Sequence, residues 1–531
     1  MLTAPTRRGV ARFALAAAIL LTAGAGPAFA QRVYQFRDDA PAAPPIMPQT
    51  LPPALPIASQ GPIALPPIPP VPPSPMAPAI PALPPYPAGK APAFPLPPSA
   101  DCTPGVPVPQ FEKVPLKDYW KSGLRFESED KDFSLFVGGR FQFDTVGYAT
   151  TRDIRSNIPG TNALEDGVSF RRIRLDMGGT IYTNIDFYAQ VDFANGLLLT
   201  NGTTRTGNNA TYPTDMWVTF KDLPLVGNIR VGNQKPLYSF EHLTSSRFLT
   251  FLERSLGFDA FAEGQNNGFE PGITAFDNYA DKRGTWGVGL FKNTRSPFGW
   301  NVGANELEVN GRITYLPVYE DGGQFLVHVG VGAATKDLDD GQARLRARLD
   351  ARNSPSALSP LVADTGNFNG RNQQILVPEF AMVNGPFSLQ AEYYASWVND
   401  ADLGTAAAPD PRGTVFFQSA YAEAAYFLTG EHREYNREAG TFGRVVPKQR
   451  LSWTRSGFTG RGAWQVAARY SYLNLSGANG NIVHDMTLGL NWFLNPNMKV
   501  QWNYFLADRQ TNGPVGNGII QGFATRLAID F

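Results

Sequence analysis

The chain has little cysteine and no long apolar run beyond its first 30 residues. Its one cysteine, Cys102, cannot form an internal disulfide, and no set of cysteine and histidine residues has the spacing of zinc ligands. We therefore expect no metal or redox chemistry and no cofactor. No later stretch approaches the roughly 20 consecutive apolar residues that a membrane-spanning helix requires. If the protein sits in a membrane, it must cross it as strands.

An excess of charge of one sign is also missing. The chain has 46 basic and 46 acidic residues, so its formal net charge is zero. Such a chain has no global field with which to recruit nucleic acid or an anionic surface. Any preference for anions must come from the positions of individual arginines.

What the sequence does contain is clearest at its end. In residues 523–531, apolar side chains alternate with small or polar ones, the apolar face is interrupted only by Thr525, and the run ends at Phe531. This pattern is typical of a strand with lipid on one side and water on the other. Unpaired backbone groups cost several kcal/mol each in hydrocarbon, so such a strand must belong to a closed barrel. The end of the chain thus predicts the closing strand of an outer-membrane β-barrel.

The beginning of the chain has the pattern of an export signal. Arginines at positions 7, 8 and 12 precede an apolar run at 13–21, and Ala-Phe-Ala at 28–30 is a cleavage site. We interpret residues 1–30 as a signal peptide that is removed on export to the bacterial outer membrane.

A proline-rich segment follows the signal peptide. Residues 41–109 consist mainly of Pro, Ala, Leu and Ile, which favours polyproline II and a semi-rigid spacer of about 200 Å when fully extended. We assign 31–118 to a disordered periplasmic spacer. Two interpretations stay open: an unstructured leader without a partner, or a tether that contacts the cell wall.

Residues 119–531 are expected to form the barrel, an all-β fold of sixteen antiparallel transmembrane strands. Short alternating segments rich in Val, Tyr, Phe and Trp are separated here by Gly, Asn, Asp and Pro. An even number of strands places both ends of the barrel in the periplasm. The candidate strands are 133–148, 168–182, 185–199, 212–221, 228–239, 268–280, 285–293, 306–319, 324–337, 374–384, 387–399, 415–429, 462–475, 485–495, 498–508 and 522–531.

The lengths of the connections support this count. Links on the periplasmic side should be short and those on the outside long, and the order of the candidate strands follows this rule at all but one position. The exception is the stretch 430–461, which is long where a short turn is expected. We interpret it as a periplasmic excursion; the alternative is an error in the strand count at that point.

Alternation also predicts which side chains face the lumen. Because a charge on the lipid side costs roughly 2–4 kcal/mol at mid-bilayer, Arg140, Arg172 and Arg174 should point inward. By the same rule Arg230, Arg312, Arg469 and Arg526 point inward, whereas Arg171 falls on the apolar face and should lie at the rim. The alternative role for such arginines is to pair with carboxylates in the lumen and stiffen the wall.

The third outer connection, 240–267, is too apolar to be exposed to water on all sides and should fold into the barrel. Phe248, Leu249, Leu252 and Leu256 recur at helical spacing, so that Arg247 and Arg254 could share the opposite face. Arginine at a narrow aqueous passage selects for anions, because its charge and donors replace part of an oxyanion's hydration shell. Alternatively, these two arginines pair with Glu253 and Glu241 within the connection.

The fifth outer connection carries a regular row of arginines. As an extended strand, Arg344, Arg346 and Arg348 would place their guanidinium groups along one edge, with Arg352 nearby. A solvated basic helix or a contact with lipopolysaccharide phosphates is the alternative.

Taken together, these pieces resemble the phosphate-selective porin O and P family. The resemblance rests on FRRIRLDMGGTIYTNIDFYAQVDFA (170–194), IRVGNQKPLYSFEHLTSSRFLTFLERS (229–255), YFLTGEHREYNREAGTFGRVVP (426–447), GAWQVAARYSYLNL (462–475), TLGLNWFLNPNMKVQWNYF (487–505) and the final RLAIDF. The resemblance implies a sixteen-strand homotrimeric channel in which a ladder of arginines leads to a central anion site.

The resemblance also suggests roles for individual residues. Arg344, Arg346, Arg348 and Arg352 correspond to outer rungs of the ladder, Arg171 and Arg172 to inner rungs, and Arg140 to a wall arginine of the constriction. Ser245 and Ser246 correspond to serines at the central site. One departure stands out, since phosphate-selective members have a lysine in the constriction loop and this chain has none between Lys235 and Lys282. Glu241 and His242 stand there instead, so selectivity for phosphate and broader or polyphosphate-type selectivity both stay open.

Catalysis is not expected. The four histidines, His242, His328, His432 and His484, do not lie in a nucleophile elbow or a similar context. We expect passive diffusion of small anions, phosphate or related oxyanions, through a channel that contacts outer-membrane lipid and lipopolysaccharide. The competing hypothesis is a non-selective or structural porin whose proline-rich arm contacts the cell wall.

Overall fold

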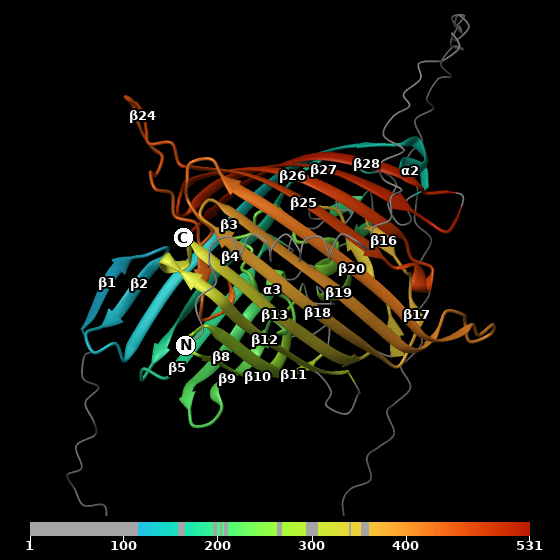
Figure 1. The fold of residues 1–531 in the computed structure, drawn as a ribbon, viewed down its shortest axis with the longest axis horizontal. Helices are drawn as coiled ribbons and strands as arrows, with labels where there is room; N and C mark the ends of the chain where they lie inside the picture. Colours follow the sequence, from blue (N-terminus) through green and yellow to red (C-terminus); the bar gives the residue numbers. More distant parts are fainter. Residues whose placement is uncertain are drawn as a thin grey trace, which may run out of the picture. The chain divides into compact units, whose positions relative to one another are not determined.

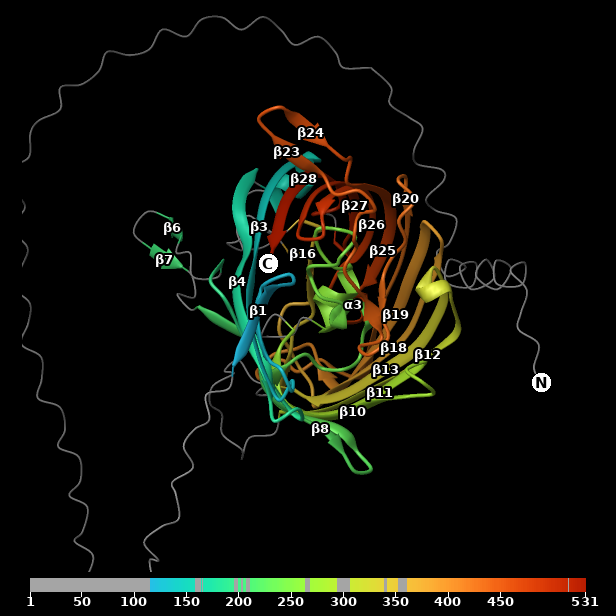
Figure 2. The same ribbon diagram turned by 90° about the vertical axis from the view of Figure 1, so that its left-hand side faces the viewer.

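The protein forms a closed β-barrel of sixteen antiparallel strands, which confirms the predicted fold class. The computed structural model describes residues 115–157, 164, 166–194, 199–201, 204–206, 211–262, 268–293, 306–338, 341–351, 361–513 and 515–531. The predicted signal peptide, most of the proline-rich spacer and Arg352 lie outside these residues. The first and last barrel strands close the ring through the register Ile520↔Thr150 to Asp530↔Arg140 (Figures 1 and 2).

The barrel strands follow one another around the ring in chain order. They are β3 (Phe133–Thr150), β4 (Gly167–Ile181), β5 (Ile185–Asp192), β8 (Tyr212–Leu223), β9 (Gly227–Gln234), β10 (Glu270–Tyr279), β11 (Gly284–Lys292), β12 (Leu307–Glu320), β13 (Phe325–Asp337), β18 (Asn372–Asn384), β19 (Phe387–Asp402), β20 (Pro411–Phe427), β25 (Ala463–Asn474), β26 (Ile482–Asn495), β27 (Met498–Gln510) and β28 (Gly518–Asp530).

All sixteen predicted strands are present, and two of them were predicted too long. The segment 228–239 was expected to be strand throughout, but β9 ends at Gln234. The segment 185–199 was expected to be a single strand, but β5 ends at Asp192. There the Asp192 carboxylate accepts the amide hydrogen of Ala194 at 3.0 Å, a local turn that competes with continued pairing. The periodic sequence did not reveal this stop.

The two faces of the wall follow the predicted alternation. In β3, Val137, Phe141 and Phe143 are exposed on the outside, whereas Arg140 and Gln142 are buried inside. Such a surface presents its apolar band to lipid and its polar side chains to the lumen.

A hairpin that the sequence did not predict precedes the barrel. Strand β1 (Leu116–Trp120) pairs with β2 (Leu124–Ser128), and β2 pairs with the periplasmic end of β3. The predicted domain boundary at residue 118 therefore falls within β1.

The remaining elements are short and lie in the connections. They are α2 (Arg152–Asn157), β6 (Leu199–Asn201), β7 (Thr204–Thr206), α3 (Phe240–Leu243), the π-helical turn η3 (Phe258–Ala262), η4 (Asp321–Gly323), β14 (Gln342–Ala343), β15 (Arg346–Arg348), β16 (Leu361–Asp364), β17 (Phe368–Asn369), β21 (Tyr435–Asn436), β22 (Thr441–Phe442), β23 (Ser452–Thr454), β24 (Gly457–Thr459) and η7 (Ser476–Ala478). No helix in the described parts of the chain has the length and apolar character needed to cross a membrane.

Candidate functional site

The connection between β9 and β10, residues 235–269, folds into the barrel as predicted; we call it the third loop. Figure 2 shows its helix α3 inside the ring of strands. The loop enters so close to the wall that a Cβ atom on Gly332 of β13 would lie 2.5 Å from the Tyr238 backbone. Farther along, Lys499 Nζ of β27 donates to the Leu249 carbonyl at 2.9 Å. The third loop therefore crosses the lumen and is fixed to wall strands on both sides.

The predicted helical face of the third loop is wrong. Among its described residues, only α3 and the short stretch 256–262 that contains η3 are helical, and residues 244–255 form turns and irregular segments. The reason lies in the partners of the loop carbonyls: Arg526 donates to Leu252, Arg469 to Glu253 and Gln501 to Thr250. Because wall side chains take these acceptors, the backbone does not form its own i→i+4 bonds there. Arg247 and Arg254 consequently do not share a helix face.

Arg171 points into the lumen and not toward the rim. In the pairing of β3 with β4, Gln142 lies opposite Arg172 and Phe143 opposite Phe170, so Arg171 is an extra residue in the ladder. Such a bulge turns two consecutive side chains to one face. Arg171 Nε donates to the Glu253 carboxylate of the third loop at 2.8 Å. The rim assignment is therefore wrong because the sequence shows no sign of the bulge.

Many of the inward arginines are bound to carboxylates. Each of these pairs joins two strands, or a strand and a loop, and all their members are buried except Arg247, which is half-buried. The pairs are Arg172–Glu253 (3.7 Å), Arg174–Asp192 (2.6 Å), Arg247–Asp176 (2.9 Å), Arg312–Glu379 (2.7 Å), Arg469–Asp350 (2.7 Å) and Arg526–Asp144 (2.6 Å). This agrees with the alternative that the sequence left open, in which arginines pair across the lumen and stiffen the wall. Arg247, however, binds Asp176 of β4 and not a carboxylate of the third loop.

Two further arginines have neutral partners. Arg254 donates to the carbonyls of Glu241 at 2.8 Å and Thr244 at 2.7 Å, which holds the turn after α3. Arg230 of β9 donates to the Thr219 hydroxyl at 2.9 Å, and its guanidinium lies 3.8 Å from the centre of the Trp217 ring. Both side chains help to shape the site, and Arg230 keeps its charge without a carboxylate partner among the described residues.

The arginine row of the fifth outer connection is extended, as one of the two sequence interpretations required. Arg346–Arg348 form β15, which pairs with β16. Arg344 binds Asp364 at 2.5 Å and Arg348 lies 3.4 Å from Asp259 of η3. The intervening Leu345 and Ala347 are buried. The row is thus packed on the third loop, which rules out the solvated helix.

Arg140 and Ser246, which resemblance alone associated, meet in the structure. Arg140 donates to the Ser246 hydroxyl at 2.5 Å, and Gln142 donates to the Ser246 carbonyl at 3.2 Å. The Ser245 hydroxyl turns away and accepts from the Arg247 amide at 3.4 Å. Among the described residues, no carboxylate lies within 4.0 Å of the Arg140 guanidinium.

Lys235 is the residue that the sequence analysis missed. It follows β9 directly, is half-buried, and its Nζ donates to the His242 carbonyl at 2.6 Å. Burial and the positive charges of Arg254, Arg174 and Arg140 lower the pKa of Lys235 well below its ordinary value. Glu241 and His242, which occupy the positions expected for a lysine, bind other residues of the third loop. Glu241 accepts from Ser255, and His242 contacts the Gly268 carbonyl at 2.8 Å.

The predicted excursion 430–461 lies in the connection 428–462, the strand count holds there, and the segment sits at the end of the barrel with the short turns. Its first half turns back into the barrel. Arg312 donates to the Gly440 carbonyl at 2.8 Å, and Tyr435 bonds His328 at 2.7 Å. The Phe442 ring packs edge-on against Phe240 of α3, with ring centres 5.2 Å apart. The lumen is therefore narrowed from the outside by the third and fifth connections and from the periplasm by this segment.

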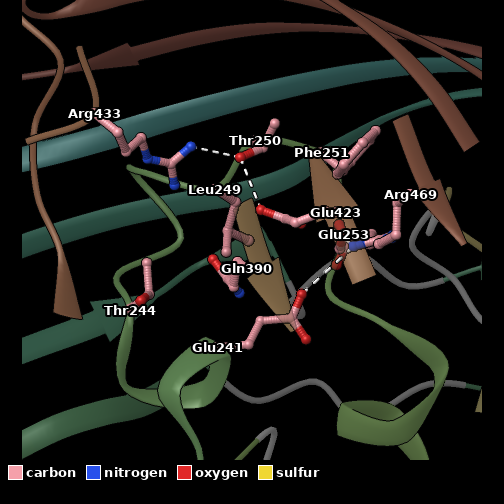
Figure 3. Close-up of a pocket in the computed structure, with 10 residues that line it drawn as sticks. All are labelled: Glu241, Thr244, Leu249, Thr250, Phe251, Glu253, Gln390, Glu423, Arg433 and Arg469. Carbon is pink, nitrogen blue, oxygen red and sulfur yellow. Dashed lines mark hydrogen bonds and ion pairs between the residues drawn. The ribbon is translucent and has the colours of Figure 1, made fainter. Parts of the chain in front are cut away.

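A narrow gap remains where these parts meet the wall. Figure 3 shows Glu241, Glu423 and Arg469 around it, with Arg433 reaching in from the periplasmic segment to Thr250. Burial raises the pKa of Glu241 to about 7, and the nearby Arg469 only partly opposes this shift. Glu241 thus changes charge near neutral pH.

Comparisons with known proteins agree with this architecture. The family model described as "Phosphate-selective porin O and P" matches residues 137–529. The chain is 29% identical to Porin O of Pseudomonas aeruginosa over 440 residues, which cover 77% of this chain and 91% of that protein. It is 28% identical over 437 residues to an uncharacterized protein of Caulobacter vibrioides, covering 79% and 78%. Among solved structures, an anion-selective porin from Comamonas acidovorans matches with a TM-score of 0.44 and 13% identity, over 75% of this chain and all of that one.

Proposed function

Because the chain belongs to the phosphate-selective porin O and P family, we propose that it conducts small anions, phosphate or related oxyanions, by passive diffusion. As a member of this family the chain is a porin of the bacterial outer membrane. Family membership does not by itself establish the preference for anions, which we argue from the residues of the site.

The observation that carries the proposal is the contact of Arg140 with Ser246 beside the third loop, with Lys235 near enough for the positive charge of Arg140 to act on it. Arg140 is buried and Lys235 is half-buried, and neither has a carboxylate within 4.0 Å among the described residues. The positive charges of Arg174 and Arg254 act on the same place. Lys235 thus takes the role of the constriction lysine that the third loop lacks in its usual position.

Crowded cations make this place favourable for an anion. Their mutual repulsion and the loss of water both raise the free energy of the empty site, and an oxyanion lowers it by accepting hydrogen bonds from the same groups. The Ser246 hydroxyl offers a further donor without a charge. The site lies in the wall of a passage, so an ion held there is free to leave toward either side.

The other arginines of the predicted pathway have a supporting role in this proposal. Arg344, Arg346 and Arg348, with Arg352 beyond them, form the approach from the outside. Arg171, Arg172, Arg174, Arg230, Arg247, Arg254 and Arg312 hold the loop and wall in place, largely through ion pairs and backbone contacts. Ser245 supports the turn that presents Ser246.

The extensive pairing of lumen arginines favours one competing function, a weakly selective or structural porin. Each paired carboxylate cancels positive charge along the wall. Assembly as a homotrimer, contact with lipopolysaccharide, and contact of the proline-rich segment with the cell wall are predictions from the sequence and the family.

Reversal potentials across planar bilayers with a KCl gradient test the proposal. The wild-type channel should prefer anions, and added phosphate should block the chloride current. A unit charge about 4 Å from an ion contributes about 1 kcal/mol even at the dielectric constant of water, so Lys235→Gln should lower the anion preference at least about fivefold.

Lys282→Gln is the matched control, because Lys282 is exposed and ion-paired to Glu438 at a periplasmic turn. It should leave the reversal potential unchanged. A wild-type channel with no preference, or with a preference for cations, would overturn the proposal in favour of the weakly selective porin.

A further inference from the structure

The second half of the periplasmic excursion forms a hairpin that the channel does not use. Strands β23 and β24 pair only with each other, with Trp453 opposite Phe458. Figure 2 shows this hairpin outside the ring of strands, beyond β28 and β27. We call residues 446–461, which include the hairpin and its flanks, the periplasmic finger.

The periplasmic finger presents large apolar side chains to its surroundings. Trp453 is 53% exposed and Phe458 is 76% exposed, although they face each other across the strand pair. Val446 is 55% exposed at the start of the finger. The hairpin is too small to bury these side chains against itself. Burying them against another surface would lower their free energy.

The charge of the periplasmic finger has one sign. Lys448, Arg450, Arg455 and Arg461 are all exposed, and the sequence contains no Asp or Glu between Glu438 and Asp485. This excess is local, because the chain as a whole is neutral. Exposed aromatic rings beside clustered Lys and Arg are the composition of segments that lie at the surface of an anionic membrane.

The base of the finger is held at the level of the membrane boundary. Trp464, Trp492 and Trp502 stack on the outer wall, with ring centres 5.0 and 6.3 Å apart, near the periplasmic ends of β25, β26 and β27. Tryptophan rings in this position mark the interface between lipid and water. The Trp492 indole donates to the Arg461 carbonyl at 2.9 Å, which ties the finger to this belt.

We propose that the periplasmic finger binds anionic phospholipids of the periplasmic leaflet, with Trp453 and Phe458 in the interface and Arg450 and Arg455 at phosphate groups. The hairpin lies outside the ring of strands, and Arg461 ties it to the tryptophan belt, which places it beside the membrane surface. Its charge complements anionic headgroups and its aromatic pair matches the interface. The proposal does not depend on the selectivity of the pore.

A nitroxide at the tip of the finger tests this proposal on the full chain. Ser456→Cys in a Cys102→Ser background allows labelling, and the protein is reconstituted into vesicles of phosphatidylcholine alone or of phosphatidylethanolamine with phosphatidylglycerol. With phosphatidylglycerol present, we expect collisions of the label with a water-soluble nickel chelate to fall and those with oxygen to rise. A label at Glu129, exposed on the turn between β2 and β3, should not respond to lipid composition.

Three double variants separate charge from burial. Arg450→Gln with Arg455→Gln should abolish the difference between the two kinds of vesicle, whereas Arg371→Gln with Arg412→Gln, which removes two exposed arginines at the outer end, should preserve it. Trp453→Ala with Phe458→Ala should return the tip of the finger to water in both kinds of vesicle. A tip equally accessible to nickel in all vesicles would overturn the proposal. Close spin–spin contact between copies, independent of lipid, would assign the finger to a second copy of the chain instead.

Discussion

At the scale of single residues, each charged side chain in the lumen is fixed by the particular neighbours that it binds. Glu253 shows this best, because its carboxylate accepts from Arg171 and from Arg526, each at 2.8 Å. Arg171, Arg172 and Arg526 share the carboxylates of Glu253 and Asp144, and these three cations on two carboxylates leave an excess of positive charge beside the third loop. The identity of such partners decides the field in the channel more than the number of arginines does.

Glu241 should make the channel respond to pH. Since its pKa is raised to about 7, the carboxyl is mostly neutral at pH 6 and mostly charged at pH 8. A charged Glu241 cancels part of the field of Arg469, so the anion preference in KCl should increase as the pH falls from 8 to 6. Reversal potentials measured across this range check the prediction, and chloride keeps its charge throughout.

Glu241→Gln should remove this pH dependence and hold the preference at its value for low pH. Glu438→Gln serves as the control, because Glu438 is an exposed carboxylate of the periplasmic segment. An unchanged slope in Glu241→Gln would assign the titration to another group.

The sequence could predict which residues face the lumen but not what they bind there. Alternation correctly turned Arg140, Arg172 and Arg526 inward, since the cost of a charge in lipid is a local matter. Their partners come from distant parts of the chain, as in Arg526 with Asp144. Lys235 escaped notice because it stands alone at the end of a strand with no pattern around it.

At the scale of elements, the third loop and the periplasmic excursion hold each other. Arg433 of the excursion donates to the Phe248 carbonyl at 2.7 Å and bonds Thr250, both in the third loop. Its guanidinium also lies 4.6 Å from the Phe442 ring. The conformation of the loop therefore depends on a segment that arrives from the opposite end of the barrel.

Arg433→Ala should loosen the third loop. Charge-assisted hydrogen bonds contribute about 1.5–3 kcal/mol each, so urea-induced unfolding in detergent micelles, followed by tryptophan fluorescence, should show a loss of at least this size. Single-channel currents should also become noisier as the loop moves.

Arg437→Ala is the matched control within the same segment. Arg437 also donates to backbone carbonyls, including that of Lys282 at 3.1 Å, but it does so on the surface. Its removal should cost about 0.5 kcal/mol or less. Equal losses of unfolding free energy in both variants would mean that the contact of Arg433 with the third loop stabilises the protein no more than a surface contact does.

Strand positions were predictable because a two-residue period is repeated over many residues, whereas the loops carry no such period. The helical spacing in the third loop was misleading, since wall side chains and not the helix supply partners for its carbonyls. The excursion at 428–462 was found only as a violation of connection lengths.

At the scale of the whole molecule, stability depends on the seam that closes the ring. Gly139 and Phe531 exchange two backbone hydrogen bonds, of 2.8 and 3.0 Å, at the periplasmic end of this seam. Farther in, Arg526 of β28 binds both oxygens of Asp144 on β3, at 2.7 and 2.6 Å, and also reaches Glu253. One side chain thus joins the first strand, the last strand and the third loop.

Arg526→Met should destabilise the barrel by about 3–5 kcal/mol, because it leaves the buried carboxylate of Asp144 without its cation and removes one of the cations that bind Glu253. Urea midpoints in micelles measure the loss. Arg526→Met combined with Asp144→Asn should recover part of it, and the remainder reflects Glu253. Arg371→Met, which breaks an exposed pair with Asp400, should cost less than about 1 kcal/mol.

The final residues predicted the closed ring because an open edge is untenable in lipid. The hairpin β1–β2 was not foreseen, since it lies at the periplasmic rim where that constraint does not apply.

The bulge at Arg171 has a consequence for how such a wall can evolve. A single additional residue in β4 brings a second guanidinium to the level of its neighbour without altering the rest of the register. Gaining or losing one codon there would shift the local charge by a whole unit while the strands on either side keep their pairing. Insertions and deletions, and not substitutions alone, are thus a route by which barrels of this kind can diversify what they admit.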